Sequence, residues 1–77
     1  MDFLRTLVEA RKAQNLSQHE LARRLGRPQS FVSKYERGER RLDVVEFLHV
    51  AGILGLSATD IIAEMERKLG PVDRPTR

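Results

Sequence analysis

Residues 18–37 read QHELARRLGRPQSFVSKYER, and this stretch decides the fold of the chain. Each half has apolar side chains at helical spacing, which are Leu21, Ala22 and Leu25 in the first half and Phe31, Val32 and Tyr35 in the second. Between the halves, Gly26 can end the first helix in a left-handed conformation, because glycine has no Cβ to clash there. Pro28 then suits the first turn of a second helix, whose N–H groups have no partner within the helix. Two short helices joined by a tight turn predict a helix-turn-helix.

Counted from Gln18 as the first place, the stretch has a small residue at its fifth place, glycine at its ninth, and apolar residues at its fourth, eighth, fifteenth and eighteenth. It also begins with Gln, opens its second half with the pair Gln29-Ser30, and closes with Glu36, Arg37 and Gly38. This pattern resembles the phage-repressor-like helix-turn-helix family, also called the Xre or Cro/repressor type. The resemblance extends over about residues 2 to 69 and departs from the family at Pro28, where many members have a Ser or Thr cap.

The resemblance implies an all-α fold, a compact five-helix bundle of the lambda-repressor-like DNA-binding type, with the helix-turn-helix formed by the second and third helices. The sequence predicts helices over about residues 2–14, 18–25, 28–37, 43–54 and 57–69. Three of these starts share a capping residue with an acidic residue three positions later, namely Ser17 with Glu20, Asp43 with Glu46, and Ser57 with Asp60. Each cap is worth about 1 kcal/mol. We therefore expect one DNA-binding domain over residues 1–69 and a disordered tail over residues 70–77.

The composition excludes several classes of protein. Seventy-seven residues allow one domain, and the lack of cysteine excludes disulfides and thiolate metal sites. No apolar run approaches the roughly 18 residues of a membrane span, and no signal peptide is visible, so we expect a soluble, cytoplasmic protein without a membrane partner. His19 and His49 have no second ligand at metal spacing, and no nucleophile elbow or phosphate loop occurs. We expect no enzyme, no metal site and no cofactor.

The basic residues are concentrated around the second half of the motif. The net charge is +3, and residues 23–41 contain seven Lys and Arg residues against only Glu36 and Glu39. This distribution is typical of a surface that binds phosphates. The alternative is a solvated surface that is rich in Arg.

The helix over residues 28–37 is expected to read DNA. With Val32 and Tyr35 facing the core, its other face is polar, which suits the base edges of a major groove. The resemblance implies that bases are contacted by Gln29, Ser30, Ser33 and Lys34, and that Gln18 grips a phosphate. We expect further contacts to the DNA backbone from Arg27, Arg37, Arg40 and Arg41. An ordinary polar surface helix is the alternative, and Phe31 is left open between the core and a thymine methyl group.

One charged residue continues the apolar stripe of the first helix. Arg11 follows Leu4, Leu7 and Val8 at helical spacing, and a charge in that position needs a partner. We expect the partner to be Glu36, as the family resemblance also implies. The pair would be structural, joining the first helix to the end of the third.

The last two predicted helices have more apolar residues than one stripe can hold. Some must cover the motif, and the remainder favour a symmetric dimer with Ile53, Ile62, Met65 and Leu69 at its interface. The alternative is that a small domain exposes these residues singly.

Together these features predict a sequence-specific transcriptional regulator, a repressor that binds a palindromic operator in double-stranded DNA as a homodimer. The two recognition helices would enter successive major grooves about 34 Å apart. Within this reading, the alternatives are a stand-alone repressor, a restriction–modification controller, and an antitoxin with a toxin partner. Outside it, the rivals are a protein-interaction adaptor and a non-specific nucleic-acid binder.

Overall fold

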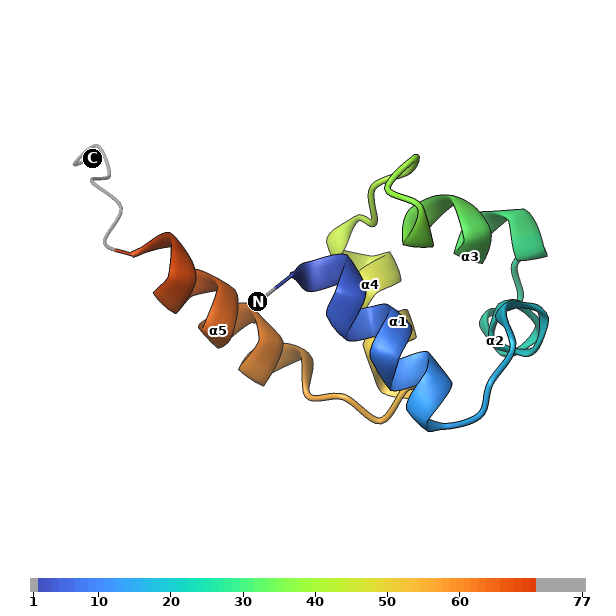
Figure 1. Ribbon diagram of the computed structural model, residues 1–77, viewed down its shortest axis with the longest axis horizontal. Coiled ribbons are helices and arrows are strands. Elements are labelled where there is room, and N and C mark those ends of the chain that lie inside the picture. Colours follow the sequence, from blue (N-terminus) through green and yellow to red (C-terminus); the bar gives the residue numbers. More distant parts are fainter. Residues whose placement is uncertain (1, 71–77) are drawn as a thin grey trace.

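The computed structural model describes residues 2–70, which form five α-helices and no strand (Figure 1). The helices are α1 (Phe3–Ala13), α2 (Gln18–Leu25), α3 (Gln29–Glu36), α4 (Val44–Ile53) and α5 (Ala58–Leu69). The predicted all-α, five-helix fold is therefore confirmed. The tail predicted over residues 70–77 lies outside the described residues, apart from Gly70, which ends α5.

The core lies where α1, α2, α3 and α4 meet, and it takes at least one large side chain from each. The largest fully buried side chains are Leu7, Leu21, Val32, Tyr35, Val50 and Leu54. Burying each aliphatic side chain stabilises the fold by about 1.5–3 kcal/mol. The apolar positions of residues 18–37 supply much of this core, so the motif is held by packing on both of its helices.

Side-chain caps begin the helices as the sequence predicted, but only one capping box is complete. Backbone N–H groups donate to Ser17 Oγ at 3.0 Å, to Asp43 Oδ1 at 2.7 Å and to Ser57 Oγ at 3.2 Å. The return bond is present at α4 alone, where Asp43 N donates to Glu46 Oε1 at 3.0 Å. At α2 the Glu20 carboxylate instead accepts hydrogen bonds from Arg23 and Arg24.

The sequence predicted the third helix over residues 28–37, and α3 is one residue shorter at each end. Pro28 has φ −62° and ψ 152°, so its backbone is extended and it is the N-cap of α3 rather than its first helical residue. Gly26 ends α2 in the left-handed conformation, with φ 70° and ψ 31°, as predicted. Arg27 N donates to Ala22 O at 2.9 Å, which satisfies a carbonyl at the end of α2 and closes the turn.

The fifth helix projects from the rest of the molecule. In Figure 1, α5 extends to the left of the body formed by α1–α4, and the molecule measures 44 × 22 × 19 Å. Its first turn is attached through Ile61, which is buried. Among residues 2–70, no helix has the length and apolar character that would span a membrane. In the same residues, no three His, Asp or Glu side chains form a group that could hold a metal ion.

Candidate nucleic-acid interface

The outer face of α3 presents free polar side chains. Gln29, Ser30 and Lys34 are exposed, whereas Val32 and Tyr35 on the opposite face are fully buried. Over residues 2–70, the side chains of Gln29, Ser30 and Lys34 make no hydrogen bond or ion pair. Their donors and acceptors are therefore available to a ligand.

Ser33 is the least exposed of the four predicted base contacts. It is half-buried, and its Oγ donates to the carbonyl of Ser30 at 3.3 Å. The structure places it on the same helix face as Ser30 and Lys34, one turn further along than Ser30. Its hydroxyl can still accept a hydrogen bond, because a serine oxygen has two lone pairs.

Two of the predicted backbone-binding arginines are accessible after the end of α3. Arg37 is exposed, and its Nε lies 2.7 Å from Oε2 of Glu39, an exposed residue whose carboxyl pKa it lowers. Arg41 is also exposed, and its side chain makes no ion pair with any described residue. Both guanidinium groups can reach a polyanion without breaking a buried contact.

Arg11 and Glu36 form a buried ion pair that also holds Gln18. Arg11 donates from Nε to Oε2 of Glu36 at 2.8 Å and from Nη2 to Oε1 at 3.1 Å, and both side chains are at most 10% exposed. The hydrogen bond from Arg11 to Glu36 raises the pKa of the guanidinium, although burial opposes this.

The side chain of Gln18, which the sequence predicted at a phosphate, also makes a hydrogen bond within the protein. Its Nε2 donates to Oε1 of Glu36 at 2.9 Å, so the amide belongs to the Arg11–Glu36 network. Only one of its two amide N–H groups is used in this way, and the residue is half-buried at the start of α2. Gln18 therefore links the first helix of the motif to the end of the second.

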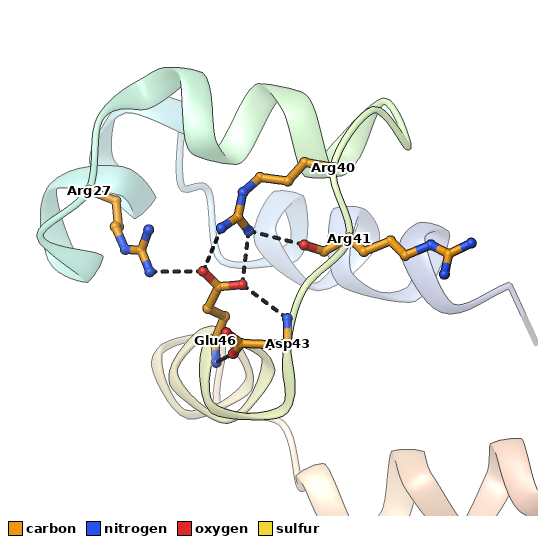
Figure 2. Close-up of polar contacts among 5 residues, drawn as sticks. All are labelled: Arg27, Arg40, Arg41, Asp43 and Glu46. Atoms are coloured by element: carbon orange, nitrogen blue, oxygen red, sulfur yellow. Dashed lines mark hydrogen bonds and ion pairs between the residues drawn. The ribbon is translucent and has the colours of Figure 1, made fainter.

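Arg27 and Arg40 converge on one carboxylate, that of Glu46 in the first turn of α4 (Figure 2). Arg27 Nη2 donates to Oε2 at 2.9 Å, and Arg40 donates from Nη1 and Nη2 to the two oxygens at 2.9 and 2.8 Å. These bonds, Arg40 first and then the N–H of Asp43, lower the pKa of Glu46 to about 2. Glu46 is only 7% exposed, so the carboxylate is buried while both arginine side chains remain partly open to solvent.

Phe31 lies beneath the same two arginines. The Cζ atoms of Arg27 and Arg40 are 4.6 and 4.8 Å from the centroid of its ring, within cation–π range. The ring is 6% exposed and meets Tyr35 edge to face at 5.6 Å. Phe31 therefore belongs to the core.

The sequence did not reveal the Glu46 cluster. It placed Arg27 and Arg40 at phosphates and gave Glu46 only its capping role. Arg40 is six positions from Glu46, but Arg27 is nineteen positions away and reaches it only through the packing of α2 on α4. The burial of Glu46, which calls for a cationic partner, becomes visible only in the fold.

The apolar residues expected at a dimer interface lie in three places. Ile62 and Met65 line a groove of about 240 Å³ together with Phe3 of α1, Leu42 and Asp43 just before α4, and Val44 and Phe47 of α4. Ile53 lines a different groove, between α2 and α4, beside Leu48. Leu69 is 75% exposed near the end of α5. The sequence did not single out Val44, Val45 and Leu48, which are exposed on α4.

Comparisons with known proteins agree with this geometry. A family model described as helix-turn-helix matches residues 7–61. Among solved structures, an XRE-family like protein from Pseudomonas syringae pv. tomato str. DC3000 is 47% identical over 88% of this chain and 82% of that chain, with a TM-score of 0.78. No curated protein matches the chain. The family match contains all of α2, α3 and α4, and therefore the whole of the α3 face and the Glu46 cluster.

Proposed function

The chain belongs to the XRE-type helix-turn-helix family of DNA-binding regulators, and from this we propose that it is a cytoplasmic transcriptional repressor that binds a palindromic operator as a homodimer. One observation carries the proposal. The exposed face of α3 holds Gln29, Ser30 and Lys34 without any hydrogen bond or ion pair to the rest of residues 2–70. A helix with such a face fits the major groove and can read base edges.

Each side chain on this face has a chemical preference. Gln29 can bond adenine in bidentate fashion, and Lys34 favours the acceptors of guanine. Ser30 and Ser33 can donate or accept, so they suit several bases. Gln29 is at the N-terminal end of α3, the end that contacts bases when a recognition helix enters the groove.

Basic side chains beside α3 would contact phosphates. Arg37 and Arg41 are exposed after the helix, while Arg27 from the turn before it and Arg40 from the segment after it meet at Glu46. Gln18 would add a bond from its free amide N–H at the start of α2. Such contacts fix the register of the protein on the duplex without reading its sequence.

A second copy of the chain would pack along the groove that contains Ile62 and Met65. The groove is mostly apolar and includes Val44 of α4, and Leu69 extends the apolar surface along α5. Self-association here would bury side chains that one copy leaves exposed, and a two-fold axis would present two α3 helices to one face of the DNA.

Selection of bound duplexes from a random DNA pool tests the proposal, at about 0.15 M salt to suppress purely electrostatic binding. The expected result is an enriched inverted repeat with half-sites one helical turn apart. Binding that fades with salt and enriches no sequence would contradict specific readout and favour a non-specific binder. Absence of duplex binding would favour a protein-interaction adaptor.

A further inference from the structure

Glu46 connects the two ends of the recognition helix to α4. Arg27 lies in the turn before α3 and Arg40 in the segment after it, as Figure 2 shows. Both guanidinium groups donate to Oε2 of Glu46, at 2.9 and 2.8 Å. The carboxylate is held in turn by the backbone N–H of Asp43 at 3.0 Å. One buried acid thus fixes two long cationic side chains from opposite ends of α3.

These two arginines keep donors for another ligand. Arg27 uses only Nη2 on Glu46, so its Nε and Nη1 make no bond within residues 2–70. Arg40 donates from Nη1 and Nη2, and its Nε makes no hydrogen bond within residues 2–70. Their side chains are 43% and 38% exposed, so the unused edges can be reached from solvent.

An arginine that is ordered before binding loses less conformational entropy when it meets a phosphate. Here each guanidinium has one edge on Glu46 and lies over the ring of Phe31, which restricts its position. We propose that Glu46 is a positioning residue for DNA binding. It holds Arg27 and Arg40 together on the same side of α3, so that both meet the DNA backbone there. This inference rests on the proposed function, because it assigns a role within the same DNA-binding surface.

Simple electrostatics makes the opposite prediction for this residue. A carboxylate near the DNA repels phosphates, so its removal should tighten binding. Replacement of Glu46 by Gln raises the net charge from +3 to +4 and keeps a residue that completes a capping box. The positioning role instead predicts weaker binding, so the sign of the change separates the two explanations.

The experiment measures the affinity of Glu46→Gln for the selected duplex across a salt series. We expect binding about tenfold weaker than the wild type, as for the loss of a hydrogen bond to a charged group. The slope of log affinity against log salt should become shallower by up to about 3.6 for the bound dimer, since each protomer would lose two phosphate contacts and each contact contributes about 0.9.

Glu20→Gln is the matched control, because Glu20 also accepts hydrogen bonds from two arginines, Arg23 and Arg24, but on α2 and away from the ends of α3. It makes the same change in charge, and we expect it to leave affinity unchanged or to tighten it slightly. If Glu46→Gln acted only by destabilising the fold, its thermal unfolding temperature would fall. The folded protein would then bind with an unchanged slope of log affinity against log salt.

Binding by Glu46→Gln that equals or exceeds the wild type, with an unchanged salt slope, would overturn this inference alone. Failure of the wild type to bind any duplex would overturn the proposed function as well. If Glu46→Gln does not fold, Arg27→Ala and Arg40→Ala provide the test, since each leaves the other arginine on Glu46. Each should reduce the salt slope by about 1.8 for the bound dimer, because one contact worth about 0.9 is lost in each protomer. An unchanged slope in both variants would overturn the inference.

Discussion

Arg11 and Glu36 are 25 positions apart in sequence, and the Nε of one lies 2.8 Å from Oε2 of the other. A third donor of Arg11, Nη1, bonds the carbonyl of Leu16 in the segment before α2 at 2.6 Å. The pair therefore joins α1, the entry to the motif and the C-terminal end of α3. A buried pair of this kind is costly to break, because the remaining charge has no solvent to stabilise it.

Arg11→Ala should lower the free energy of unfolding by about 3–5 kcal/mol. Urea denaturation followed by circular dichroism measures the change. Arg5→Ala is the control, since it removes the exposed Arg5–Glu9 pair on the same helix and should cost about 0.5 kcal/mol or less. Equal losses in the two variants would show that Arg11–Glu36 does not behave as a buried pair.

Gly26→Ala should destabilise the protein by about 1–2 kcal/mol, because φ is +70° and an alanine there is strained even though its Cβ would meet no atom within 4 Å. Gly52→Ala should instead stabilise the protein, since Gly52 lies inside α4 and an added Cβ also meets open space there. The expected gain is about 0.5–1 kcal/mol. Thermal melts of the two variants give the comparison, and changes of the same sign would contradict it.

Acid should destabilise the protein through Glu46 and Glu20, whose carboxyl groups both have a pKa lowered from 4.5 to about 2 by arginine partners. A folded-state pKa below the unfolded value means that the stabilisation is present above about pH 4.5 and is lost as the pH falls toward about 2. Unfolding free energy measured over this interval should fall less steeply in Glu46→Gln than in the wild type. Identical pH profiles would contradict this assignment.

Ile62→Glu should shift the protein from dimer to monomer in sedimentation velocity and weaken operator binding. It places a charge in the apolar groove proposed for the second copy. Leu48→Glu is closely matched, because Leu48 is 48% exposed and Ile62 is 49% exposed, but Leu48 lines the other groove. It should leave the dimer intact. Dissociation by Leu48→Glu alone would move the interface to α2 and α4.

Gln29→Ala should change which base is preferred at one position of each half-site, at a cost of about 1–3 kcal/mol for the preferred sequence. Arg41→Ala should weaken binding to all sequences alike and reduce the salt slope by about 1.8 for the dimer, since each protomer loses one contact worth about 0.9. Affinities for the operator and for single-base variants measure both effects. A uniform loss in Gln29→Ala would show that it contacts the backbone and not a base.

The helix-turn-helix could be predicted because its signals are local. Gly26 ends α2, Ser17 and Asp43 cap α2 and α4, and the apolar spacing decides which face is buried. Pro28 was misplaced by one residue, because its φ suits both an N-cap and a first helical position, and only ψ distinguishes them.

The polar contacts could not be predicted in the same way. Which carboxylate an arginine meets depends on how helices pack, and that is not visible in spacing. Gln18 and Arg27 face Glu36 and Glu46 only because α2 lies against both α3 and α4. The exposure of Val44 likewise depends on where α5 projects, since a helix that lay closer over the start of α4 would have covered it.

The separation of α5 from the motif has a consequence for how such a protein can diverge. The residues proposed to meet DNA lie on α2, α3 and the segments beside α3, and those proposed to meet a second copy along the α5 groove lie on α4 and α5. The two sets have no member in common. After gene duplication, one copy could acquire substitutions on α5 that prevent it from pairing with its sister while both still recognise the same operator. The reverse change, on α3, would alter the target and leave the choice of partner untouched.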